Sequence, residues 1–404
     1  MVETKVIDID IIEQTQETKN LIIKGKSKLF PVMRIPLENL QYNKLNGRIA
    51  TWISEYLSNE GEFPEDSERA NEIIEGFIES SNPDLLKKTK NNIELFDQQE
   101  AAVVLKNGII VDGNRRFTAL RQLSREGKGQ NFNYIKAVLL DSEEYTQKEI
   151  KTLELNLQHA KEERVDYNPI DRLVDIYRDL IAYDAPFTAA EYAREIASTE
   201  KMVSQEMEVS QLMVDYLDYI GQPLMFHIAR QQKIDGPLRE ARRILKSKKL
   251  EDDDREAARD VIFASIASLD GDVTRKIRDM KNVVQDVDML GKVVKELDET
   301  LDNIDAHFRE EKVVKTTQQT HTVNVPSEAK NKVIEVTSRY AERKKLSSAQ
   351  KAPIESLKKS LDRINDIDSD AVVRMSSDDI EEFAELVNQI QERLDSFKVL
   401  TNAN

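Results

Sequence analysis

The residues with the clearest chemical potential lie between 109 and 123, where IIVDGNRRFTALRQL joins a strand-like run to a helix-like run. Gly113 permits a tight backbone turn at this junction. The free amides and the positive dipole end of a starting helix attract anions, and Arg115 and Arg116 follow at once. The segment therefore predicts a phosphate-binding site. A pair of surface arginines at an ordinary strand–helix junction is the alternative interpretation.

A second polar segment, LELNLQHAKEERVDYNPIDR, occupies residues 153–172. Taken together, the two segments resemble the ParB branch of the ParB/sulfiredoxin superfamily. In that family G-E-R-R-x-R-A is followed by E-N-x-Q-R-x-D-L-N-P-x-E. Here GNRRFTA stands at 113–119, and LNLQ at 155–158 precedes RVDYNPID at 164–171. The segment IPLENL at 35–40, running to Arg48, resembles the family's opening box.

The resemblance covers roughly residues 30–175 and implies a nucleotide-binding domain. ParB proteins bind CTP with magnesium, and binding closes the dimer into a clamp around DNA. The residues that would contact phosphate by position are Gly113, Asn114, Arg115, Arg116, Gln158 and Arg48. Asn156 would hold the metal, which suits the preference of Mg²⁺ for oxygen ligands and phosphates. Glu154 and Asn156 are the candidates for a weak CTPase or NTPase activity.

Four features depart from the family pattern. One is an insertion of five residues in the second motif, where His159 follows Gln158 and the next Arg is Arg164. In the second family motif a Glu stands before the Asn, and this Glu is linked to hydrolysis. Its position is occupied by Leu155 here, and Glu154 stands one place earlier. The last Arg position of the first motif is Thr118, and residues 86–99 lack the G-x-x-x-P-I element beside the base pocket. Hydrolysis and the identity of the base, CTP or another nucleotide, therefore stay open.

A helix-turn-helix candidate follows the nucleotide segments. FTAAEYAREIA at 187–197 resembles the first helix of the ParB DNA-reading unit, and EVSQLMVDYL at 208–217 resembles the second. A reading helix presents Arg, Lys, Asn or Gln to bases, whereas this one carries acidic side chains and no Lys or Arg from Met202 to Ala229. A purely structural role is the favoured interpretation, and DNA binding through this helix is doubtful.

A basic ridge lies nearby on a predicted helix. Its members share one helical side: Arg239, Arg242, Arg243, Lys246 and Lys249. The ridge could contact a nucleic-acid backbone. Alternatively, it could pair with the acidic run at 251–254 or with a neighbouring subunit, or form a solvated charged face.

The pattern around these motifs predicts an α+β N-terminal domain followed by an all-α remainder. A strand entering a turn is expected at 29–40, a further strand at 135–141, a β-hairpin at 101–113, and helices at 48–57, 68–78 and 114–125. An apolar stripe from Val273 to Phe308 indicates a coiled coil or a long bundle helix. The predicted divisions are a ParB-like domain (1–165), a helix-turn-helix-like domain (166–250), a long helix or coiled coil (251–310), a linker (311–326) and a C-terminal helical bundle or dimerisation module (327–404).

Composition narrows the function classes. The 404 residues include no Cys, which excludes disulfides, thiolate zinc sites and Cys nucleophiles, and the four His lack metal-ligand spacing. No leader or membrane-spanning run is expected, which predicts a cytoplasmic protein. A net charge of −16 disfavours nucleic acid unless basic residues gather on one surface.

Three functions are consistent with these observations. The first is a dimeric switch that binds CTP or another nucleotide with magnesium and could load onto DNA. The second is an adaptor that uses the same scaffold and its helices to bind a protein partner. The third is a nuclease or phosphotransferase of the same superfamily.

Overall fold

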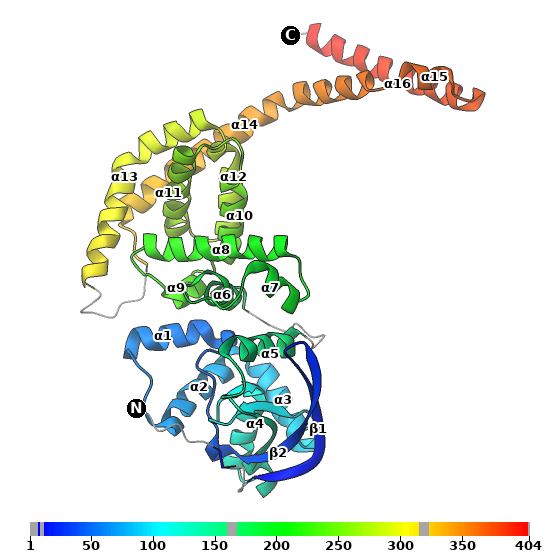
Figure 1. The fold of residues 1–404 in the computed structure, drawn as a ribbon. Helices are drawn as coiled ribbons and strands as arrows, with labels where there is room; N and C mark the ends of the chain where they lie inside the picture. Colours follow the sequence, from blue (N-terminus) through cyan, green and yellow to red (C-terminus); the bar gives the residue numbers. More distant parts are fainter. Residues whose placement is uncertain (1–6, 9–11, 160–167, 315–322, 403–404) are drawn as a thin grey trace. The chain divides into compact units, whose positions relative to one another are not determined.

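The computed structural model describes residues 7–8, 12–159, 168–314 and 323–402. The chain forms two units, Met1–Tyr340 and Ala341–Asn404. The first unit begins with a five-stranded mixed sheet in the order β1-β2-β5-β3-β4, of which Figure 1 labels β1 and β2. Its strands are β1 (Glu13–Ile23), β2 (Lys26–Pro36), β3 (Ala102–Leu105), β4 (Ile110–Asp112) and β5 (Tyr134–Leu140).

The sheet contains one parallel contact, between β3 and β5; its other neighbours are antiparallel. The predicted hairpin is confirmed as β3 and β4, which turn through Lys106–Asn107–Gly108. This turn is tied to the chain after β2, because Gln41 N–H donates to Gly108 O (2.9 Å) and Ile110 N–H donates to Gln41 O (3.1 Å). A Cβ on Gly108 would lie 2.4 Å from the Asn39 carbonyl oxygen, so only glycine fits.

Helices cover both faces of the sheet. One apolar cluster joins Ile35, Val104 and Ile135 from the strands to Phe117 and Leu120 from the helix that follows β4. The opposite face contributes Val32, Val103 and Val138, which pack against Leu153. Strands β3 and β5 are therefore covered on both faces of the sheet, which accounts for their nearly continuous apolar sequences.

The helices of the sheet-containing part are α1 (Ala50–Glu60), α2 (Ser67–Ser81), α3 (Pro83–Phe96), α4 (Asn114–Arg125) and α5 (Gln147–His159). Short 3₁₀ segments lie at η2 (Leu37–Asn39), η3 (Gly47–Ile49) and η4 (Gln130–Asn133). The α+β character expected for the first part of the chain is thus present.

The rest of the first unit is helical. Its elements are α6 (Pro169–Ile176), the π-helix η5 (Tyr177–Ile181), α7 (Ala189–Glu195), α8 (Glu200–Tyr219), α9 (Phe226–Gln231), α10 (Asp235–Leu245), α11 (Asp252–Ser268), α12 (Val273–Val284) and α13 (Val287–Val314). The expected helix pair at 187–217 corresponds to α7 and α8. No described helix is long and apolar enough to cross a membrane.

The apolar stripe from Val273 to Phe308 belongs to two helices, α12 and α13, which are separated at Gln285 and Asp286. Ile277, Met280, Leu297 and Phe308 of this stripe are buried within the first unit. The stripe therefore fills the core of a helical bundle. Part of the expected linker at 311–326 belongs to α13, and residues 315–322 lie outside the described part.

The C-terminal helices are α14 (Ser327–Asn365), α15 (Ser369–Val373) and α16 (Ser377–Asn402). The start of α14 belongs to the first unit, where Val333 and Val336 are buried. In the second unit the apolar rows of α14 and α16 are exposed, as Leu361 (58%) and Ile390 (44%) illustrate. These rows lie within the segment 327–404, for which a helical bundle or dimerisation module is expected.

Candidate functional site

The phosphate-binding candidates line one cavity of about 590 Å³ beside the start of α4. The predicted residues that it gathers are Arg48, Gly113, Asn114, Arg115, Arg116, Glu154 and Gln158. Apolar side chains, including Ile49, Ile78 and Ile93, form another part of the wall. A pocket of this size, with apolar walls and a few convergent polar groups, has the character of a small-molecule site.

The start of α4 gives this cavity a backbone anion site. Gly113 is the N-cap residue at φ +112°, and it has no side chain to accept hydrogen bonds from the first-turn amides. A Cβ at this position would lie 2.8 Å from the Cβ of Ala102. Glycine is therefore required both by the backbone conformation and by the close approach of β3.

Arg116 is held in the cavity wall by two carboxylates. Its Nη1 donates to Glu100 Oε2 and its Nη2 donates to Asp112 Oδ2, both at 2.7 Å. The side chain of Arg116 is 14% exposed. These pairs fix the guanidinium in place and balance its charge, so a phosphate that contacts Arg116 must share it with Glu100 and Asp112.

Helix α5 presents one face to the cavity and another to the helical part. Glu154, Leu157 and Gln158 line the cavity, and Gln158 Nε2 donates to Glu154 Oε1 at 3.1 Å. Leu155 is buried with Ile176 and other apolar side chains of the helical part. The Leu in place of the family's Glu is thus a packing residue.

Asn156, the expected metal ligand and catalytic candidate, is half-buried and is not among the residues that line the cavity. The reason is helical geometry, because residues at spacings of three and four share a face and Asn156 is displaced from the face of 154, 157 and 158. The structure therefore does not bring Asn156 together with the arginines.

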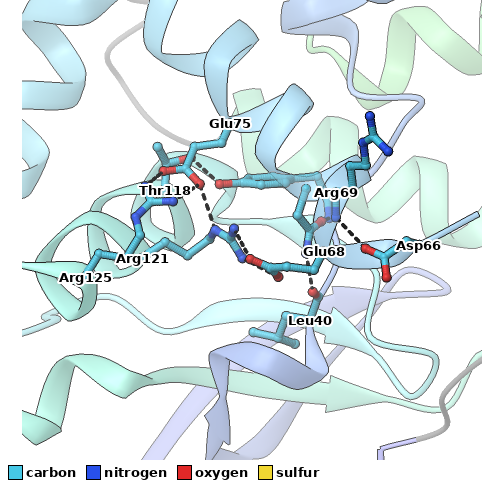
Figure 2. Close-up of polar contacts among 10 residues, drawn as sticks. Leu40, Asp66, Glu68, Arg69, Glu75, Thr118, Arg121 and Arg125 are labelled. Atoms are coloured by element: carbon cyan, nitrogen blue, oxygen red, sulfur yellow. Dashed lines mark hydrogen bonds and ion pairs between the residues drawn. The ribbon is translucent and has the colours of Figure 1, made fainter. Parts of the chain in front are cut away.

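Helix α4 is anchored behind the cavity by a buried ionic network (Figure 2). Arg121 Nε donates to Glu75 Oε2 at 2.8 Å, and its Nη2 donates to Glu68 Oε1 at 2.6 Å. Arg125 also pairs with Glu75. Glu75 and Arg121 are only 4% and 7% exposed, so removal of either one would leave a buried charge without its main partner.

The same network reaches the first turn of α4. The hydroxyls of Tyr42 and Thr118 lie 2.7 Å apart, and Thr118 Oγ1 donates to Asn114 O at 3.0 Å. Burial raises the pKa of Tyr42, so its hydroxyl stays protonated. Thr118, which stands at the family's last Arg position, therefore supports the helix and is fully buried.

A buried acidic cluster adjoins the cavity beneath α5. Lys151 Nζ lies 3.4 Å from Glu154 Oε2 and 3.7 Å from Asp179 Oδ2. Burial raises the pKa of Glu154 and of the neighbouring Asp175. Burial, with Asp175 and Glu154 nearby, raises the pKa of Asp179 to about 7 despite Lys151.

The basic ridge makes ion pairs inside the helical part. Arg239 forms a two-bond fork with Glu206 (2.6 and 2.9 Å), and Arg242 Nε donates to Glu208 Oε2 at 2.6 Å. Lys246 also pairs with Glu208.

Arg243 pairs with Glu240 of its own helix. Lys249 is exposed. Helix α10 ends at Leu245, so Lys249 lies beyond the expected helical side. Arg239, Arg242 and Lys246 pair with the acidic α8, which lies directly against α10, and not with residues 251–254.

The cavity also contains residues that the sequence did not single out. Gln98, Glu100 and Asp112 line it, and Gln98 Nε2 bonds to the backbone oxygens of Glu100 (2.8 Å) and Lys136 (2.7 Å). Asp112 carried a signal, since it ends a predicted strand before Gly113. Gln98 and Glu100 had none, because only the folded sheet places residue 98 beside β5.

A cluster of three or more His, Asp or Glu side chains able to hold a metal by themselves is absent from the described residues. No protein family model, curated protein or solved structure matches this chain.

Proposed function

We propose that this protein is a nucleotide-regulated switch of the ParB-like type, in which the cavity beside α4 binds a nucleotide, with CTP as the first candidate. The observation that supports it most is the convergence of Arg48, Gly113–Arg116 and Gln158 on one cavity. These residues come from three separate parts of the chain. A surface arginine pair at a strand–helix junction would not require that convergence.

The cavity offers different chemistry at different walls. The amides of the first turn of α4 and the guanidiniums of Arg115 and Arg48 suit phosphate oxygens. The apolar wall formed by Ile49, Ile78 and Ile93 suits a base or ribose. The nucleotide would then lie with its phosphates toward α4.

Magnesium fits this arrangement as a partner of the phosphates. Mg²⁺ in nucleotide sites is held by one or two carboxylates, the phosphates and water, so no three-carboxylate cluster is needed. Glu154 and Gln158 are the α5 residues among those lining the cavity that carry side-chain oxygens. They would hold the ion, and Glu154 is the candidate base for hydrolysis, in place of Asn156.

A dimer is part of the proposal, and the second unit supports it. Leu357, Leu361 and Ile364 on α14 and Ile390 and Leu394 on α16 are all exposed. Apolar rows of this length on two helices are usually buried against another helix pair. A second copy of the unit would bury them in a four-helix arrangement.

DNA is less well supported as a partner than a protein. The α8 carboxylates and the α10 cations already pair with one another, so neither helix presents an unbalanced basic face. The adaptor function is favoured by the exposed apolar rows, which a partner protein could also cover.

The decisive experiment is calorimetry of the full chain with CTP, ATP, GTP and UTP, with and without magnesium. We expect magnesium-dependent binding of one nucleotide, weakened by about tenfold or more in Arg115→Ala because a charge-assisted contact is lost. Arg125→Ala, on the same helix but outside the cavity, is the control for charge. If none of the four nucleotides binds, the switch is excluded and the adaptor is favoured.

A further inference from the structure

A second, smaller pocket adjoins the nucleotide cavity. It has a volume of about 330 Å³ and shares Arg48, Ser81 and Arg115 with the larger cavity. Its other lining residues are Asn82, Asn168, Asp171 and Arg230. Every described residue that lines it is polar or charged, in contrast with the partly apolar wall of the main cavity. This pocket suits an anionic group and not a base.

The charges of this pocket are unequal. The charged residues that line it are Arg48, Arg115, Arg230 and one acid, Asp171. Asp171 Oδ1 accepts a hydrogen bond from Thr51 N–H at 2.9 Å, and burial raises its pKa. Asp171 interacts with Arg230, and the neighbouring Asp175 interacts with Arg48. Arginines still outnumber carboxylates among the lining residues, which favours an anion as the ligand.

Arg230 is held in position for such a contact. Its Nη1 donates to Thr51 Oγ1 at 2.9 Å, and its guanidinium lies 4.4 Å from the centre of the Trp52 ring. A guanidinium has five N–H donors, and among the described residues only this one donor forms a hydrogen bond. The remaining donors make Arg230 a pre-oriented anion ligand.

The pocket also joins two parts of the fold. Arg48 and Arg115 belong to the sheet-containing part, whereas Arg230 lies on α9 and Asp171 on α6. Helices α1 and α9 are in contact, as are η3 and α6. An anion bound here would touch both parts and stabilise their contact.

We propose that this pocket binds the terminal phosphate of a nucleoside triphosphate and that Arg230 makes affinity depend on the length of the phosphate chain. The inference rests on the proposed nucleotide site, because the first phosphates must lie at the start of α4. The phosphate chain of the nucleotide would then pass Arg48 and Arg115, which line both pockets, and end at Arg230. Helices α6 and α9 thereby distinguish a triphosphate from a diphosphate.

The test is calorimetry of the full chain in magnesium with the tri-, di- and monophosphates of each nucleoside. The wild type should bind a triphosphate about tenfold or more tightly than the diphosphate, the usual effect of one lost charged contact. Arg230→Gln should remove most of this preference and leave diphosphate affinity within about threefold of the wild type, because the diphosphate does not reach Arg230. Arg230→Lys, which keeps the charge without the fork, should retain an intermediate preference.

Arg194→Gln is the matched control, since Arg194 is exposed on α7 and lines neither pocket. Thermal unfolding without ligand identifies a variant that is merely destabilised. If Arg230→Gln is destabilised, the triphosphate preference of Arg230→Lys is the test of the inference. An unchanged preference in Arg230→Gln, or equal weakening of both ligands, overturns the inference and leaves the nucleotide site standing. Absence of binding by the wild type overturns both.

Discussion

Arg116 donates from Nη2 to Asp112 Oδ2 at 2.7 Å, across the single turn that contains Gly113. The pair closes the junction between β4 and α4 and fixes one wall of the candidate nucleotide cavity. The junction depends on the glycine, because β3 lies directly against it.

Gly113→Ala should therefore destabilise the fold and distort the site. The substitution imposes both positive-φ strain and the 2.8 Å approach to Ala102, for a loss of about 2–4 kcal/mol in the free energy of unfolding. Gly127→Ala, at φ +68° with nothing within 4 Å, should show only the conformational cost of about 1 kcal/mol. Urea unfolding measures both, and equal losses would contradict the close approach.

The buried network behind α4 predicts different effects for two arginines of that helix. Arg121→Met leaves Glu75 and Glu68 without their main partner and should cost about 3–5 kcal/mol of stability. Arg125 is 55% exposed, so Arg125→Met should cost about 1 kcal/mol. Denaturant unfolding at neutral pH compares them. If Arg125→Met costs as much as Arg121→Met, the network is not organised around Arg121.

Asp179 should make stability depend on pH. Its pKa rises from an ordinary 3.8 to about 7 in the fold, so between these values the folded chain holds a proton that the unfolded chain has released. Stability contributed by this group is therefore present below about pH 4 and is lost as pH rises toward about 7.

The wild type should lose on the order of 2–4 kcal/mol relative to Asp179→Asn across that range. Asp184→Asn, which alters an exposed carboxylate, should follow the wild type. Urea unfolding at half-unit pH steps gives the comparison, and parallel curves for the wild type and Asp179→Asn would refute the assignment.

The exposed rows of the second unit predict self-association. Leu361→Arg combined with Ile390→Arg should convert a dimer to a monomer, because charges would replace buried apolar contacts. Asp362→Arg is the control at a neighbouring polar position. Light scattering coupled to size exclusion reports the mass. If the wild type is already monomeric, self-association is contradicted, and a partner protein becomes the candidate that buries these apolar rows.

Strong local patterns allowed much of the first part of the fold to be predicted. The hairpin, β5 and α4 each combine an apolar period with turn or capping residues. Two elements were missed: β1, whose polar sequence buries chiefly Leu21, and α3, although Asn82 and Pro83 form a recognisable helix start. Because β1 is an edge strand with most of its side chains exposed, it has little apolar alternation to detect.

The candidate site was predictable where its residues are close in sequence. Residues 113–116 form one turn and were found from it. Arg230 could not be assigned, because its position depends on α9 packing against α1, far away in the chain. Asn156 is not among the residues that line the cavity, and the sequence motif alone does not show this because it carries no information on the helical phase of α5.

The turn Lys106–Asn107–Gly108 has a practical consequence for anyone modifying this protein. A short surface hairpin is ordinarily a natural place to insert an epitope tag or a fluorophore-bearing peptide. Here Gly108 packs against the Asn39 carbonyl and bonds to Gln41, so an added loop would pull apart the backbone that leads from β2 to Arg48. Labels are better attached elsewhere.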